Sequence, residues 1–220
     1  MAVTDRIIAP WPAPAGVNAW VTLRSFGDMK GEGRSLLKGR VPSEPVWLRQ
    51  VHGARVVDAD ARPQLPDADA AVARAPRAVC AVLMADCMPV FLTDESGSVV
   101  GLAHAGWRGL AAGVIEATIE CMKVTPSRLM AWLGPAIGPD SYEVGEDVRT
   151  AFPGCEGAFH PARPGHWRLD LYAVARQRLA NAGVVRVYGG GYCTYRDSER
   201  FFSYRRDRAA ERMAGLIWLA

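Results

Sequence analysis

Two mainly apolar runs separated by a short polar turn constrain the fold of this chain more than any other feature. The first run covers residues 82–92, the second covers residues 99–105, and the turn Asp94-Glu95-Ser96-Gly97-Ser98 lies near the end of the first. Runs of this length on both sides of a turn are typical of paired strands. The stretch therefore predicts a strand, a turn and a second strand that contribute to the core.

Reactive side chains lie near the outer ends of this pair. Cys87 comes early in the first run and His104 comes late in the second. Because Pro89 has no N–H to donate to a sheet, the chain near Cys87 is expected at a bulge, a sheet edge or a strand end. His104 is followed by Ala105-Gly106, and glycine allows close approach of the backbone before a helix begins.

Apolar spacing elsewhere predicts two helices and several further strands. Apolar residues recur every three or four positions over residues 110–122, and Pro126 ends that helix. Asp170 is a favourable N-cap for a second helix ending near Gly183. Further strands are expected at residues 17–23, 46–51, 55–59, 78–83, 129–133 and 184–188.

The region before residue 60 is predicted to contain one loop and one hairpin. Residues 25–43 are rich in glycine and charge, which indicates a mobile loop with at most a short turn near its middle. Residues 46–51 run into His52-Gly53, and residues 55–59 follow as a return strand. This interpretation places His52 at the tip of a hairpin.

The fold class expected from these elements is α+β, a mixed α/β arrangement of sheets and helices around one core in a single domain, residues 1–220. Hairpins occur beside helices, which argues against a simple doubly wound parallel sheet. The sequence contains neither a dinucleotide-binding glycine motif nor a phosphate-binding P-loop motif.

Composition narrows the expected setting. The net charge of +3 is small for 220 residues and gives no support to nucleic-acid binding. Five cysteines without a Cys-x-x-Cys pair favour reduced thiols, as in cytosolic proteins. The N-terminus lacks the pattern of a secretion signal, and no apolar run reaches the ~18 residues of a membrane span. We expect a cytoplasmic protein without a membrane segment.

Three candidate functional residues are predicted at strand ends: His52, Cys87 and His104. Two imidazoles and one thiolate suit zinc and leave a fourth position for water. A rival interpretation makes Cys87 a nucleophile with His104 as its base, oriented by Asp86 or another carboxylate. A third treats Cys87 as a small buried apolar residue and each histidine as a satisfied polar group. The residues alone leave all three open.

Five motifs in sequence order resemble the laccase-domain family, whose members have been called polyphenol oxidases, purine nucleoside phosphorylases and peptidoglycan editing factors. The resemblance extends from about residue 10 to the C-terminus. The motifs are Leu-Arg-Gln-Val-His-Gly at residues 48–53, Ala-Asp-Cys-Met-Pro-Val at 85–90, Ala-His-Ala-Gly-Trp-Arg-Gly-Leu at 103–110, Leu-Gly-Pro-Ala-Ile-Gly-Pro at 133–139 and Phe-Phe-Ser-Tyr-Arg-Arg-Asp at 201–207.

This resemblance implies a helix/sheet/sheet/helix sandwich of mixed sheets and a Zn²⁺ site formed by the same three candidate ligands. It implies phosphorolysis of adenosine, inosine, guanosine or methylthioadenosine, with adenosine deamination as a second activity. The alternatives are a hydrolase that edits peptidoglycan precursors and a copper-dependent polyphenol oxidase. One cysteine and two histidines are too few ligands for a multicopper centre.

Further residues and partners complete the predicted site. Asp86 is a candidate catalytic residue beside Cys87 and His104, and Gln50 and Arg205 are candidate contacts for substrate. The resemblance makes Arg24 a candidate contact for phosphate. We expect a monomer whose partners are a purine nucleoside and phosphate. Residues 25–40 depart from the family pattern, which predicts an altered loop beside the pocket.

Overall fold

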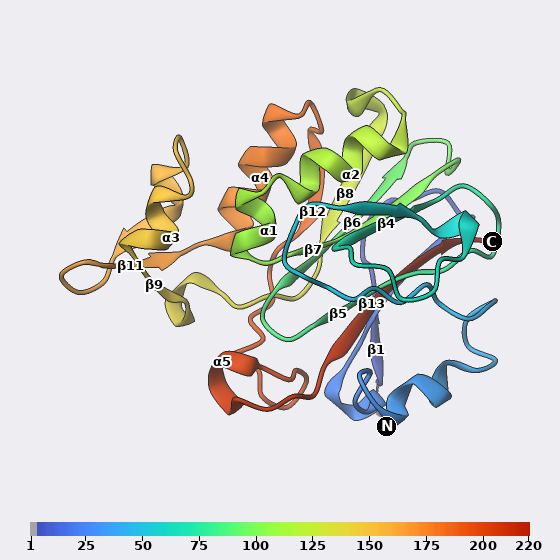
Figure 1. The fold of residues 1–220 in the computed structure, drawn as a ribbon, viewed down its shortest axis with the longest axis horizontal. Coiled ribbons are helices and arrows are strands. Elements are labelled where there is room, and N and C mark those ends of the chain that lie inside the picture. Colours follow the sequence, from blue (N-terminus) through green and yellow to red (C-terminus); the bar gives the residue numbers. More distant parts are fainter. Residues whose placement is uncertain (1–3) are drawn as a thin grey trace.

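A six-stranded mixed sheet forms the centre of the structure, a computed structural model that describes residues 4–220 (Figure 1). Its strands lie in the order β12-β8-β6-β7-β4-β3. The strands in this order are β12 (Arg186–Gly189), β8 (Leu129–Leu133), β6 (Met88–Asp94), β7 (Val100–Ala105), β4 (Ala70–Ala73) and β3 (Val56–Asp58). β6 and β7 are antiparallel and joined by the turn at residues 95–99, as the apolar runs predict.

A second, four-stranded sheet packs against one face of the first. Its order is β1 (Arg6–Ile8), β2 (Val17–Thr22), β13 (Met213–Leu219) and β5 (Cys80–Met84). Alternate residues of β5 and β13 point toward the six-stranded sheet, where they meet Phe91 and Trp132, whose ring centroids lie 5.0 Å apart. The other residues of β5 and β13 point away from it, so these strands are apolar on both faces.

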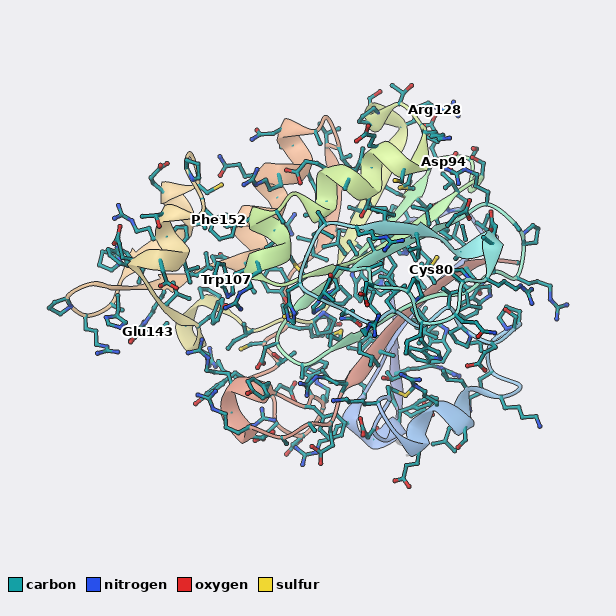
Figure 2. The ribbon with its side chains drawn as sticks, in the orientation of Figure 1. Cys80, Asp94, Trp107, Arg128, Glu143 and Phe152 are labelled. Carbon is teal, nitrogen blue, oxygen red and sulfur yellow. The ribbon has the colours of Figure 1, made fainter. Side chains whose placement is uncertain are left out.

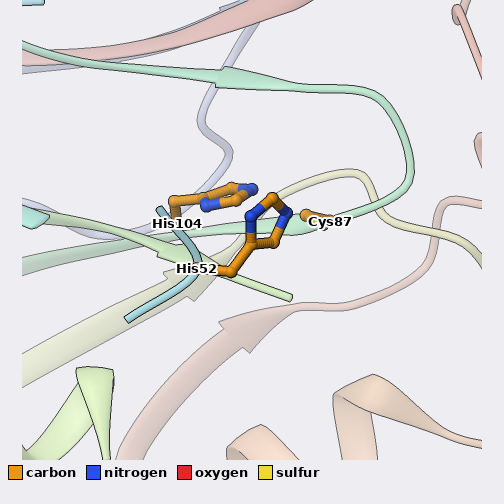
Figure 3. Close-up of side chains that lie close together, drawn as sticks. All are labelled: His52, Cys87 and His104. Carbon is orange, nitrogen blue, oxygen red and sulfur yellow. The ribbon is translucent and has the colours of Figure 1, made fainter. Parts of the chain in front are cut away.

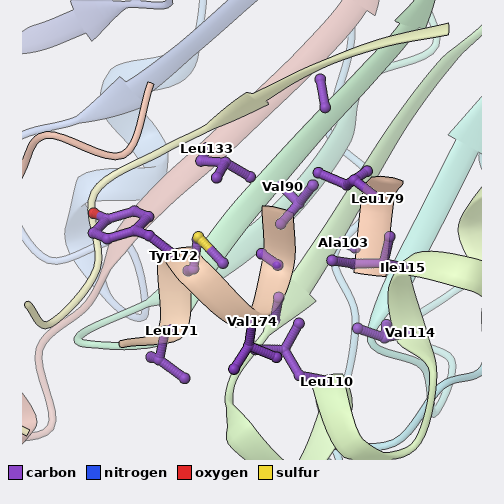
Figure 4. Close-up of a cluster of buried hydrophobic side chains, with 14 of the residues drawn as sticks. Val90, Ala103, Leu110, Val114, Ile115, Leu133, Leu171, Tyr172, Val174 and Leu179 are labelled. Atoms are coloured by element: carbon purple, nitrogen blue, oxygen red, sulfur yellow. The ribbon is translucent and has the colours of Figure 1, made fainter. Parts of the chain in front are cut away.

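Helices cover the other face of the six-stranded sheet (Figures 1 and 4). They are α1 (Trp107–Ala111), α2 (Val114–Met122) and α4 (Leu171–Asn181). Figure 4 shows Ile115 of α2 and Leu179 of α4 among the apolar side chains over the sheet. The Asp170 carboxylate accepts hydrogen bonds from the amides of Tyr172 and Ala173 in the first turn of α4, which confirms the predicted N-cap.

The outer face of the four-stranded sheet is covered by short 3₁₀ helices, η1 (Arg24–Phe26) and η2 (Glu32–Leu37). Phe26, Met29 and Leu37 are buried there against Trp20 and Trp218. The layered mixed fold is therefore confirmed, with a thin outer layer of 3₁₀ turns on this side. Residues 25–43 form those turns instead of a loop with one short turn, because their few apolar side chains are anchored on the sheet.

A small three-stranded sheet projects from one end of the molecule, at the left of Figure 1. It consists of β10 (Phe159–Pro161), β11 (His166–Leu169) and β9 (Glu143–Gly145), and α3 (Glu146–Thr150) follows β9. The remaining short helices are η3 (Ala59–Ala61), η4 (Pro126–Arg128), η5 (Pro139–Ser141), η6 (Glu156–Ala158) and α5 (Tyr204–Asp207). Figure 2 shows Glu143 and Phe152 in this projecting part.

The predicted hairpin before residue 60 is wrong. Residues 46–51 and 55–59 form no hairpin: Val46 and Arg49 make isolated bridges to Cys80 and Asp67, and β3 pairs in parallel with β4. Pro89 is the second residue of β6, so the chain near Cys87 lies at a strand end, one of the three predicted positions, although β6 is an interior strand. It is tolerated because pairing of β6 with β8 begins only at Val90, so Pro89 is opposed on one side alone.

No helix among residues 4–220 has both the length and the apolar character that crossing a membrane requires. The first three residues, which belong to the N-terminus examined for a secretion signal, lie outside the described part of the chain.

Candidate metal centre

The three residues predicted at strand ends come together in one cluster (Figure 3). The donor atoms of His52, Cys87 and His104 all lie within 4.8 Å of one another. The two imidazole rings meet edge to face, with centroids 4.9 Å apart. His104 is buried, Cys87 is partly buried and His52 is exposed, so the cluster is reached from the side of His52.

Each of these side chains comes from a different part of the fold. His104 lies in β7, one residue before its end. Cys87 lies in the crossover Ala85–Cys87, where the chain leaves β5 in the four-stranded sheet and enters β6 in the six-stranded sheet. His52 lies in a turn, with a left-handed backbone at φ 61°. Cys87 and His104 are at strand ends as predicted, whereas His52 is held outside any strand.

Asp69 holds two of the three candidate ligands, and sequence reasoning missed it. This aspartate has no exposed surface. Its carboxylate accepts backbone hydrogen bonds from Val51 (3.1 Å), His52 (3.0 Å) and Gly53 (2.7 Å). It also lies 2.9 Å from Nδ1 of His104. A charged residue between alanines directly before a buried strand was the signal in the sequence.

Gly106 gives the cluster the space that it needs. A Cβ atom at this position would lie 2.7 Å from Sγ of Cys87 and 3.6 Å from Cδ2 of His52. The shorter distance is well inside van der Waals contact, so any other residue would displace the thiol. The glycine after His104-Ala105 is therefore required by the sulfur atom.

Electrostatics keep the sulfur and one imidazole oppositely charged when no metal is bound. Burial opposes ionisation of Cys87, but the charge of His104 and hydrogen bonds from both histidines outweigh it and lower the Cys87 pKa to about 6. Burial likewise opposes protonation of His104, yet the Cys87 thiolate and Asp69 raise its pKa to about 9. Near neutral pH the pair is thiolate and imidazolium.

Asp86 and Gln50, two further predicted site residues, are engaged with the protein itself. The Asp86 carboxylate accepts hydrogen bonds from Oγ1 of Thr194 (2.7 Å) and the amide of Arg205 (2.6 Å). The carboxylate that contacts His104 is Asp69 and not Asp86. The Gln50 amide makes a reciprocal pair with the backbone of Leu83, at 2.8 and 2.7 Å, and so joins its segment to β5.

The two predicted arginines lie in or beside the segment that contacts Asp86. The Arg205 guanidinium stacks 5.1 Å from the ring centroid of Tyr142 and donates to the carbonyl of Glu143. Arg24 stacks 5.1 Å from the ring of Phe202. Burial and the negative charge of Cys87 raise the Tyr142 pKa, so this phenol stays protonated.

The cluster suits a transition-metal ion. Two imidazole nitrogens and one thiolate form a zinc donor set, and three protein ligands with an exposed side leave a position for water or substrate. The low pKa of Cys87 supplies the thiolate that such an ion requires. The donor set therefore fits the predicted Zn²⁺.

Several known proteins are similar to this chain over nearly its whole length. Purine nucleoside phosphorylase from Xylella fastidiosa is 46% identical, covering 97% of this chain and 96% of that protein. Purine nucleoside phosphorylase YfiH from Escherichia coli is 44% identical, covering 99% and 100%. A crystal structure of Neisseria meningitidis protein NMB0706 matches with a TM-score of 0.94 at 43% identity, covering 98% of this chain and 99% of that one.

A more distant structure, YlmD from Geobacillus stearothermophilus, matches with a TM-score of 0.85 at 28% identity, covering 100% of this chain and 97% of that one. The model of the family described as multi-copper polyphenol oxidoreductase laccase matches residues 32–220. These matches confirm the resemblance seen in the five motifs. The chain belongs to this laccase-like family.

Proposed function

We propose that this protein is a zinc-dependent purine nucleoside phosphorylase. The observation that carries the proposal is the group His52, Cys87 and His104, with its donor atoms within 4.8 Å and one exposed side. Relatives at 44–46% identity over nearly the whole chain are named purine nucleoside phosphorylase, which supports the choice of reaction. Adenosine, inosine, guanosine and methylthioadenosine are the proposed substrates, with phosphate.

In phosphorolysis an oxygen of phosphate bonds to C1′ of the sugar while the bond from C1′ to the base nitrogen breaks. The base leaves with the bonding electrons and takes up a proton. A zinc ion bound by this cluster would supply positive charge and acidify a bound water. We propose that the second activity, adenosine deamination, uses a water at the same place.

The surrounding residues are proposed to bind and orient the reactants. Arg205, whose amide is held by Asp86 beside Cys87, presents a guanidinium suited to phosphate. Arg24, against Phe202, is proposed as a second phosphate contact. Tyr142, kept protonated, can donate a hydrogen bond to a substrate oxygen or nitrogen. Asp86 is proposed to act by holding Arg205 and Thr194.

The test is phosphate-dependent release of base. Zinc-loaded protein incubated with inosine and phosphate should yield hypoxanthine and ribose 1-phosphate, and incubated with adenosine alone should yield inosine. Cys87→Ser should remove both activities. Absence of phosphate-dependent base release from all four nucleosides would contradict the proposal, and copper in the isolated protein with oxygen uptake on phenols would favour the oxidase.

A thiol hydrolase acting on peptidoglycan precursors is a second candidate. It is favoured because Asp69 contacts His104, which in turn contacts Cys87. A carboxylate, an imidazole and a thiolate in that order are the parts of a cysteine nucleophile and its base. The two candidates differ in their need for metal. Hydrolysis of precursor peptides by chelator-treated protein, abolished by alkylating Cys87, would favour this candidate.

A further inference from the structure

The Asp69 carboxylate is saturated by donors from both sides of the metal centre. It accepts from three successive amides, those of Val51, His52 and Gly53, and from Nδ1 of His104. One oxygen, Oδ1, accepts from both the His52 amide and the His104 ring. The backbone carbonyl of Asp69 also accepts from the His104 amide at 2.7 Å. A single buried residue therefore fixes two candidate metal ligands relative to each other.

We propose that Asp69 is a positioning residue that sets the affinity of the centre for its metal ion. Nδ1 of His104 donates a hydrogen bond to Oδ1, so Nε2 is the nitrogen left to bind a metal ion once it gives up its proton. The choice of nitrogen in this histidine is thus made by Asp69. The inference rests on the metal centre of the proposed function.

The backbone of His52 gives the second part of the argument. A φ of 61° is unfavourable for a residue with a Cβ atom and persists only where its surroundings enforce it. Three consecutive N–H groups that converge on one carboxylate provide that constraint. Without the carboxylate, no acceptor holds the turn at residues 51–53 in this conformation, and the His52 imidazole is no longer fixed beside Cys87 and His104.

An asparagine at position 69 would have nearly the same shape as the aspartate but could not accept all four hydrogen bonds. Its amide has one accepting oxygen, and its NH₂ group would oppose donors. With its oxygen at the place of Oδ1, its NH₂ group would face the Val51 and Gly53 amides. With the oxygen at the place of Oδ2, its NH₂ group would face the His52 amide and the His104 ring, so two of the four donors lose their acceptor either way.

The matched control is Asp94, a second buried aspartate that binds backbone amides. Its carboxylate accepts from the amides of Ser98 (2.7 Å) and Val99 (3.1 Å) in the turn between β6 and β7, and makes no contact with the metal cluster. Asp94→Asn therefore removes the same chemical group from a structural turn.

The experiment measures zinc affinity of the full chain by competition with a chromogenic chelator, together with the absorption spectrum of the Co²⁺ form. We expect Asp69→Asn to weaken zinc binding by about 10–100-fold and to change the Co²⁺ spectrum. Asp94→Asn should bind both ions like the wild type while melting at a lower temperature. Equal zinc affinity in Asp69→Asn and wild type, or an equal loss in both variants, would overturn the inference.

Nuclear magnetic resonance of the wild-type zinc form tests the same inference even if Asp69→Asn does not fold. Long-range ¹H–¹⁵N spectra, assigned with a His104→Gln variant, should show His104 protonated at Nδ1 and metal-bound at Nε2. Binding through Nδ1 would overturn the role of Asp69 and leave the proposed function standing. A wild type that binds no zinc would overturn both.

Discussion

Asp69 and Asp94 are both buried aspartates that collect N–H groups, yet they differ in where those groups come from. The partners of Asp94 lie within five residues, at Ser96, Ser98 and Val99. The partners of Asp69 lie 16 to 18 residues away in one direction and 35 residues away in the other. The Asp94 carboxylate stabilises one turn. The Asp69 carboxylate joins separate elements around a reactive cluster. Burial is nearly the same for both, so the origin of the donors is what distinguishes the two roles.

The largest effect on zinc affinity is expected when a ligand itself is removed. Cys87→Ser should weaken zinc binding by more than about 100-fold, because a hydroxyl is a poorer zinc ligand than a thiolate. Removing a residue that only hydrogen-bonds to a ligand costs at most about 100-fold. Equilibrium competition measures the zinc affinity. Cys193→Ser is the control, since that thiol accepts from the Gly138 amide and donates to Oγ of Ser141, and it should leave zinc binding unchanged. Comparable zinc affinity in wild type and Cys87→Ser would show that Cys87 is not a zinc ligand. Asp69 would then have no metal centre to support.

A smaller effect is expected at Gly106. The added methyl group of Gly106→Ala would lie 2.7 Å from Sγ of Cys87, so the sulfur must move and zinc affinity should fall about 10-fold, equivalent to about 1.4 kcal/mol. Gly157→Ala meets no heavy atom within 4 Å and serves as the control. Calorimetric titration of both variants distinguishes the two positions. Unchanged binding in Gly106→Ala would show that the sulfur is not fixed there.

Asp86 is intermediate between the two carboxylates, since it adjoins a ligand but binds Thr194 and Arg205. Asp86→Asn should lower the free energy of unfolding by about 1–3 kcal/mol. It should reduce kcat less than about 10-fold, because its contacts hold the neighbouring segment. Denaturant unfolding and steady-state kinetics measure the two quantities. A loss of kcat approaching that of Cys87→Ser would instead make Asp86 a catalytic residue.

No change in zinc affinity is expected at Asp94, only a pH-dependent change in stability. Burial opposes its ionisation, but hydrogen bonds from Ser96, Ser98 and Val99 outweigh it and lower the Asp94 pKa. The stabilisation is therefore present above the unfolded-state pKa of about 3.9 and is lost as pH falls through the lower folded-state value. At pH 7 Asp94→Asn should cost about 1–3 kcal/mol.

Urea denaturation of wild type and Asp94→Asn between pH 7 and pH 2 measures this effect. The difference between the two proteins should shrink as the pH falls below about 4, because Asp94 of the unfolded chain takes up a proton there while the folded carboxylate still resists it. A constant difference over the whole range would show that the Asp94 charge contributes nothing to the turn.

The same distinction between local and remote partners explains what could be predicted from the sequence. The turn at residues 94–98 and the cap at Asp170 depend on neighbours, and both are confirmed. The predicted helix over residues 110–122 is divided into α1 and α2, because the backbone is left-handed at Gly113, with φ 85°. The hairpin at residues 46–59 was wrong because β3 pairs with β4, a partner that local alternation does not specify.

The candidate site divides in the same way. Cys87 and His104 could be found because each adjoins an apolar run that ends at a proline or glycine. In the sequence, Asp69 was marked only as a charged residue before a buried strand, and its partner could not be predicted, since the contact with His104 spans 35 residues. Gly106 was recognised as a residue that allows close approach, but the sulfur that requires it becomes visible only in three dimensions.

The crossover Ala85–Cys87 has a consequence for the order of assembly. β5 belongs to one sheet and β6 to the other, so the thiol between them is in place only after the two sheets have docked. Docking depends on contacts far apart in sequence, which form late during folding. An ion held by this cluster would therefore be acquired by a nearly folded protein, and zinc supply is expected to change the final stability and not the first folding steps.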